Sequence, residues 1–178
     1  MAWVETVNRF WFQELDAADW FSGRPEVDAR IAERFGDLRA RLKLRPPAAD
    51  SLDAEGHLAA VIVFDQFSRN LFRQSAEAYA TDPLALALAR HAVDRGLDAE
   101  LAPQQRQFLY MPFMHSEDRG IQALSVALFG KLGDAKASRY AEHHKGVIDR
   151  FGRFPHRNAV LGRISSEAEQ AFLLSEPA

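Results

Sequence analysis

Cysteine is absent from all 178 residues of the chain. Disulfide bonds, thiolate metal sites and catalytic thiols are therefore excluded. The remaining nucleophiles are serine, threonine, lysine and carboxylate side chains, and none has a base at the spacing of a known catalytic motif. The absence of cysteine fits a reducing compartment, and we expect a cytoplasmic protein.

Long apolar runs are missing as well. The longest, Leu58 to Phe64, is far too short to cross a bilayer. At the N-terminus, Glu5, Asn8 and Arg9 come too early for the apolar part of a secretory signal. The sequence therefore predicts a soluble protein with no membrane partner.

Neither sign of charge dominates the chain. It has 22 lysines and arginines against 25 acidic residues, a formal net charge of −3. This balance gives no electrostatic reason to expect nucleic acid, and we predict no nucleic-acid partner. A chain of this length with 47% hydrophobic residues can bury one core. We expect a single domain over residues 1–178.

No segment alternates apolar and polar residues as a half-buried strand does. Apolar residues recur instead at steps of three and four, as in Val4, Val7, Trp11 and Leu15. Residues 60–64 are strand-like by residue type, but the same apolar stripe continues with helical spacing on both sides. We predict an all-α fold, a bundle or a short stack of helix pairs.

Capping residues and prolines predict where several helices begin and end. Asp82 and the proline after it predict a cap and a first helical turn. Pro112 predicts a kink or stop, and Ser116 predicts the cap of the following helix. Ser166 and Glu169 have the spacing of a capping box for a short final helix.

Three segments mix charged and aromatic residues more closely than solvated loops or packed cores usually do. They are 65–70, 110–118 and 151–158. Such a mixture usually lines a cleft, where apolar groups exclude water and fixed donors converge on a polar ligand. These segments therefore indicate where a site lies.

The 151–158 segment carries the strongest signal. Arg153 and Arg157 present planar donors suited to carboxylate or phosphate, His156 joins them when protonated, and Asn158 adds an amide. Arg163 lies close enough in sequence to reach the same region. The alternative is a buried polar network, in which these arginines bond to helix C-terminal carbonyls and to Asp65 or Glu117.

In the 65–70 segment, Asp65 and Arg69 have the i,i+4 spacing of an ion pair turned toward the core. This pair either fixes the helix structurally or orients Arg69 toward a ligand. Asn70 either caps the end of the helix or presents its amide to the same ligand.

Histidines supply the candidates for acid–base chemistry. His115 and Glu117 lie close in sequence and offer either a structural helix start or a proton-transfer pair. His144 lies on an apolar stripe, as a core histidine or a cleft wall. His143 and His144 point about 100° apart on a helix and do not share a metal readily, so we predict no metal site.

The same segments resemble a family of mostly bacterial proteins known as domain-of-unknown-function family 924. The resemblance rests on 65–73, on 110–118, and on 150–158 with the Leu-Gly-Arg that ends at Arg163. It covers essentially the whole chain, although Ser68 stands where the family pattern has proline. The resemblance implies a compact all-helical domain of stacked antiparallel helix pairs, similar to tetratricopeptide-repeat folds. It implies no established activity.

Two functions from different classes follow from these candidates. The first is a binding module whose groove holds an anionic small molecule or a peptide or protein partner. The second is an enzyme on an anionic small molecule, with an arginine clamp. Neither function requires a cofactor. Aromatic side chains at the surface could form the contact between copies of the chain in a homo-oligomer. The predicted ligand-binding residues are Arg69, Asn70, His144, Arg153, His156, Arg157 and Asn158, and the catalytic candidates are Asp65, His115, Glu117 and His156.

Overall fold

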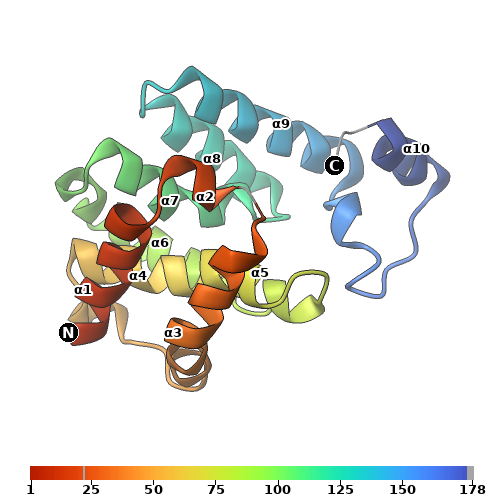
Figure 1. Ribbon diagram of the computed structural model, residues 1–178. Helices are drawn as coiled ribbons and strands as arrows, with labels where there is room; N and C mark the ends of the chain where they lie inside the picture. Colours follow the sequence, from red (N-terminus) through yellow and green to blue (C-terminus); the bar gives the residue numbers. More distant parts are fainter. Residues whose placement is uncertain (22, 176–178) are drawn as a thin grey trace.

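The computed structural model describes residues 1–21 and 23–175. Every regular element in these ranges is a helix, and none is a strand, so the fold is all-α as predicted (Figure 1). The longer helices are α1 (Ala2–Arg9), α3 (Pro25–Leu44), α4 (Ala54–Val61), α6 (Asp82–Asp94), α7 (Pro103–Met114), α8 (Arg119–Gly130), α9 (Ala135–Phe151) and α10 (Glu167–Ser175). No helix in the described ranges is long and apolar enough to cross a membrane.

Short helical turns complete the chain. Two are single α-helical turns, α2 (Ala17–Trp20) and α5 (Ser68–Leu71). The π-helical turns are η1 (Phe10–Glu14) and η3 (Ile62–Phe67), and the 3-10 turns are η2 (Ala49–Ser51), η4 (Ala76–Tyr79), η5 (Leu97–Glu100) and η6 (Pro155–Arg157).

The central element is the continuous run α4, η3 and α5. Every residue from 56 to 68 is buried, which confirms a central helix apolar nearly all round. Helix α4 contacts α1, α6 and α7. The π-helical turn η3 was not predicted, and it brings the polar pair Asp65 and Gln66 into the core.

An aromatic cluster packs against this run. Phe67 lies edge-on to Trp11, with ring centroids 5.7 Å apart, and meets Phe35 at 4.8 Å. Trp11 also meets Phe108 of α7 edge-on at 5.5 Å. These rings join α3, η1 and α7 to the end of η3, and so fix the position of the residues that follow Phe67.

Ser68, the position at which we noted a departure from the resemblance, continues the helix. Its backbone angles, φ −60° and ψ −40°, are ones that proline also adopts. The hydroxyl accepts a hydrogen bond from Arg39 Nε at 3.1 Å and bonds Thr81 Oγ1 at 2.8 Å. Serine therefore preserves the local geometry and ties α5 to α3 and to the start of α6.

One predicted helix signal was wrong, and another was confirmed. Asp118, not Ser116, caps α8, because its carboxylate accepts from the Ile121 N–H at 2.9 Å. The stop predicted at Pro112 is confirmed, because Pro112 lies in the last turn of α7, which ends at Met114. As a result the helix end falls one residue before His115, whose carbonyl is left without an intrahelical partner.

The C-terminal segment packs on the end of α9 (Figure 1). Gly152 ends α9 in the left-handed conformation, at φ 72°. Phe154 is then buried with Val147 and Ile148 of α9 in a small second core. This turn brings η6 toward the junction of α7 and α8. The predicted capping box of α10 is confirmed by Ser166 N–H donating to Glu169 Oε2 at 2.7 Å.

Candidate functional site

The buried carboxylate of Asp65 lies at the centre of a polar cluster. Its exposed fraction is 0%. It receives hydrogen bonds from His115 Nδ1 at 2.7 Å and Gln66 Nε2 at 2.6 Å, and pairs with Arg69 Nη1 at 3.0 Å. The predicted core-facing pair of Asp65 and Arg69 is therefore present, with His115 added from the end of α7.

Charge and burial act in opposite directions on this pair. Burial alone would raise the pKa of Asp65, but Arg69 and His115 hold that pKa far below its usual range. Burial lowers the pKa of His115, so its imidazole is neutral at pH 7. Because Asp65 is ionised, Nδ1 of His115 carries the proton and Nε2 carries the lone pair.

The Nε2 atom of His115 is the open end of this pair. It has no hydrogen-bond partner among the described residues, and the side chain is 15% exposed. An imidazole fixed at Nδ1 and open at Nε2 can accept a proton or a hydrogen bond from a molecule outside the core.

Asp82, the first residue of α6, joins two arginines to the cluster. Arg69 donates to both of its oxygens, at 3.0 and 3.1 Å, and Arg157 Nη1 lies 3.5 Å from Oδ2. The predicted cap role of Asp82 is wrong, because Thr81 occupies the N-cap position. The carboxylate of Asp82 instead turns into the cluster and links η6 to α5.

Arg157 is a buried cation with few polar partners. It is 6% exposed, and its guanidinium lies 4.6 Å from the ring centroids of both Tyr79 and Phe154. Nη2 donates to the carbonyl of His115 at 2.9 Å, and Nε has no acceptor in the described parts of the chain. Burial, followed by the nearby charge of Arg69, lowers the pKa of Arg157.

Two more imidazoles lie beside this cluster. The ring of His144 is 6.4 Å from that of His115 and 5.5 Å from that of Phe154, and its Nδ1 donates to the Tyr140 carbonyl at 2.8 Å. Burial lowers the pKa of His144 to about 4. His156 is exposed at the surface, 5.6 Å from Phe154, and partial burial together with the charge of Arg157 lowers its pKa.

Glu117 does not pair with His115, because Asp65 takes that position. Glu117 instead accepts a hydrogen bond from the backbone N–H of Phe154 at 2.8 Å. It also accepts two hydrogen bonds from the guanidinium group of Arg163, at 2.7 and 3.0 Å. These contacts hold the 151–163 segment against the α7–α8 junction. Glu117 is therefore a structural anchor beside the cluster and not a proton donor to His115.

Three other predicted ligand residues point elsewhere. Arg153 pairs with Glu169 at 2.7 Å, and Asn70 donates to Asp28 of α3 at 2.7 Å. Asn158 is buried, 1% exposed, and donates to Ser165 at 3.0 Å. Each of these three side chains is bonded to another side chain of the protein. This agrees with the alternative prediction, in which such residues form a polar network within the protein. The cluster that remains contains Asp65, Arg69, Tyr79, Asp82, His115, His144, His156 and Arg157, and we call it the Asp65 cluster.

Sequence reasoning missed Tyr79 as a member and assigned Asp82 another role. Tyr79 lies in a short 3-10 turn, and its immediate neighbours in sequence, Ala78 and Ala80, are both apolar. No group of three or more histidine, aspartate or glutamate side chains in the described ranges is arranged to hold a metal ion.

Comparison with known proteins places the chain in a family. The family model described as bacterial protein of unknown function (DUF924) matches residues 7–177. The chain belongs to this family. A solved structure titled as a protein of unknown function, ATU0120 from Agrobacterium tumefaciens, is similar over 98% of both chains, with 36% identity and a TM-score of 0.90. No curated protein matches. Membership in DUF924 therefore supports the fold and supplies no activity.

The buried imidazoles make stability depend on pH. The unfolded chain protonates His144 near its ordinary pKa of 6.5, whereas burial lowers that pKa to about 4 in the folded chain. Protons therefore favour the unfolded chain, and the free energy of unfolding should fall as the pH drops from about 7 to about 4.5. His144→Gln should remove about 2 kcal/mol of this decline, measured by urea unfolding across pH. His143→Gln, at the exposed neighbouring position, is the matched control. An unchanged slope in His144→Gln would contradict the assignment.

Proposed function

We propose that the protein binds a small anionic molecule at the Asp65 cluster, where Arg157 meets His115, His144 and His156. The observation that carries the proposal is the state of Arg157. This cation is almost fully buried between two rings, and one carboxylate at 3.5 Å is its only acidic partner in the described ranges. A buried guanidinium usually has more hydrogen-bond acceptors than this. A bound anion would supply the acceptors that the protein itself does not provide.

The chemistry of the imidazoles supports the same ligand class. Two carboxylates (Asp65, Asp82) and two guanidinium groups (Arg69, Arg157) balance in charge, so the free site is nearly neutral. An incoming anion would raise the lowered pKa values of His115, His144 and His156 toward their ordinary values. Binding would therefore be coupled to proton uptake and be tighter in acid.

The exposure of the site favours a small group over a long peptide. Arg157 and His115 have side chains that are 8% and 15% exposed, so only a few ligand atoms reach them. A phosphate or carboxylate group is small enough to reach these side chains. Arginine binds either group through two parallel hydrogen bonds.

The test uses inorganic phosphate and citrate as probes, with calorimetry at pH 5.5 and 7.5. We expect binding that is tighter at pH 5.5, and an affinity at least about tenfold weaker in Arg157→Lys, which keeps the charge but loses the planar donors. His156→Gln, at an exposed position, should weaken binding without loss of stability. Arg90→Gln, an exposed arginine on α6, is the matched control. The proposal fails if neither anion binds at either pH, or if the Arg157 and Arg90 variants bind equally well.

A second candidate function, proton transfer by an enzyme, rests on the pair of Asp65 and His115. Their 2.7 Å contact orients a neutral imidazole with its lone pair outward, as a general base requires. In this function Arg157 would hold the anionic substrate while Nε2 of His115 accepts its proton, and Asp65 would stabilise the imidazolium that forms.

The tautomer of His115 tests this second function directly. Long-range nitrogen–proton NMR correlations at pH 7 should show His115 neutral, with Nδ1 protonated and Nε2 bare. Asp65→Asn should weaken this tautomer preference, because the amide replaces the charged acceptor. A His115 that is cationic at pH 7, or protonated at Nε2, would rule out its role as a base.

A further inference from the structure

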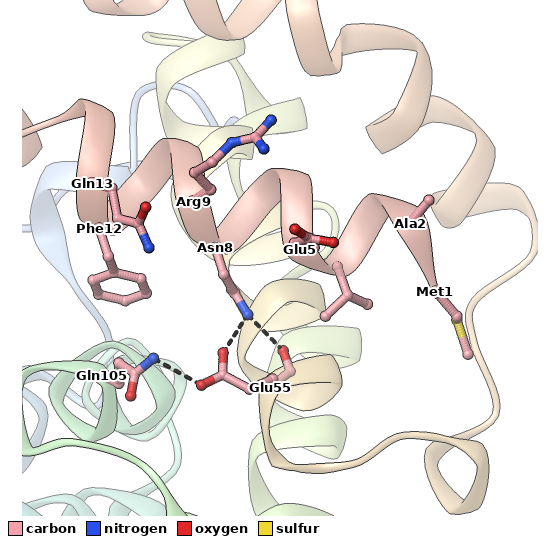
Figure 2. A pocket seen from close by; sticks show the side chains of 10 residues that line it. Met1, Ala2, Glu5, Asn8, Arg9, Phe12, Gln13, Glu55 and Gln105 are labelled. Carbon is pink, nitrogen blue, oxygen red and sulfur yellow. Dashed lines mark hydrogen bonds between the residues drawn. The ribbon is translucent and has the colours of Figure 1, made fainter.

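A second concave site, which shares no residue with the Asp65 cluster, lies between α1, the start of α4 and the start of α7. It has a volume of about 560 Å³. Its wall is one face of α1 and η1, and its floor carries Glu55 and Gln105 (Figure 2). This size falls in the range of small-molecule sites.

The floor holds a carboxylate in a fixed position without neutralising it. Asn8 Nδ2 donates to Glu55 Oε2 at 2.5 Å, and Gln105 Nε2 donates to Oε1 at 3.0 Å (Figure 2). Asn8 also donates to the backbone carbonyl of Glu55 at 3.1 Å. Both partners are neutral amides, so the negative charge of Glu55 stays uncompensated.

Several other glutamates of the protein have a cationic partner that Glu55 does not have. Glu14, Glu117 and Glu169 each pair with an arginine, and Glu55 has no cationic partner within the described ranges. Arg9 lines the same pocket, but its guanidinium lies 3.7 Å from Glu14 and extends away from Glu55 in Figure 2. A second carboxylate, Glu5, also lines the pocket.

The rest of the wall suits an apolar group. Val4 and the ring of Phe12 also line the pocket. A cation that approaches Glu55 would therefore have an aliphatic and an aromatic surface beside it, and the face of an aromatic ring attracts cations. Gln13 adds an amide at the same wall.

We propose that this pocket binds an organic ammonium ion that carries an aliphatic chain. The ammonium group donates to the free lone pairs of Glu55, and the chain lies against Val4 and Phe12. An ammonium on an aliphatic chain occurs in free polyamines and in the lysine side chains of peptides, and both present the same chemistry to Glu55. The site is separate from the Asp65 cluster, so either proposal can fail without the other.

The experiment is an NMR titration of the full chain with butylammonium, with hexanoate as the probe of opposite charge. We expect butylammonium to shift the amide signals of Asn8, Glu55 and Gln105, and hexanoate to leave them unchanged. Raising the salt concentration should weaken the binding, because the carboxylate is exposed. Glu55→Gln should lower the affinity at least about fivefold, since it removes the charge and keeps the shape.

Two controls keep the result decisive. Glu142→Gln changes an exposed glutamate on α9 and should bind butylammonium as the parent does. Spermidine and a short lysine peptide, titrated in parallel, show which source of the ammonium fits the pocket better. Absence of shifts at the pocket, equal shifts with hexanoate, or equal affinity in Glu55→Gln and Glu142→Gln would each overturn the proposal. The shifts in the parent protein decide the question even if Glu55→Gln does not fold.

Discussion

The structure depends on Asp65, a carboxylate that has no contact with solvent. Burying such a group makes folding less favourable unless other groups compensate its charge. Ionised carboxylates lose several kcal/mol of hydration when buried, and only close positive or donating partners offset this. Here Arg69 and His115 are those partners, and they come from α5 and from the end of α7. Removing Arg69 would leave this charge without its cationic partner, at a cost of about 3–5 kcal/mol.

This requirement organises the surrounding elements. Arg69 reaches from Asp65 to Asp82 and so joins α5 to the first turn of α6. Arg157 then joins Asp82 to the carbonyl of His115, which is free because α7 ends one residue earlier. The C-terminal segment is therefore attached to the central run through one chain of polar contacts, and the proposed ligand site is the open edge of that chain.

The sequence allowed the helical class and the central helix to be predicted, because an apolar stripe with helical spacing is a strong local signal. The pair of Asp65 and Arg69 followed from i,i+4 spacing in the same way. The stacking of helix pairs like tetratricopeptide repeats stays a prediction. The π-helical turn η3 was not predictable, because a shift of one backbone hydrogen bond leaves the residue pattern almost unchanged.

The site was predicted in part. His115 was a candidate to act with either Asp65 or Glu117, and its partner in the structure is Asp65, 50 residues earlier, not the nearby Glu117. Tyr79, which lies over Arg157, carries no mark in sequence because its role depends on tertiary position alone. Arg153 and Asn70 were reasonable candidates by residue type, yet acidic partners from distant elements occupy them. Local patterns identify residues that can bind, and only the fold decides which remain available.

The central claim is that Asp65 stays ionised in the core and holds Arg69 and His115 together. The direct measurement is a titration of the Asp65 side-chain carboxyl carbon by NMR, followed as far into acid as the protein stays folded. We expect this carboxyl to remain ionised at about pH 3, where ordinary aspartates are largely protonated. Protonation of Asp65 at or above pH 4 in the folded protein would contradict it.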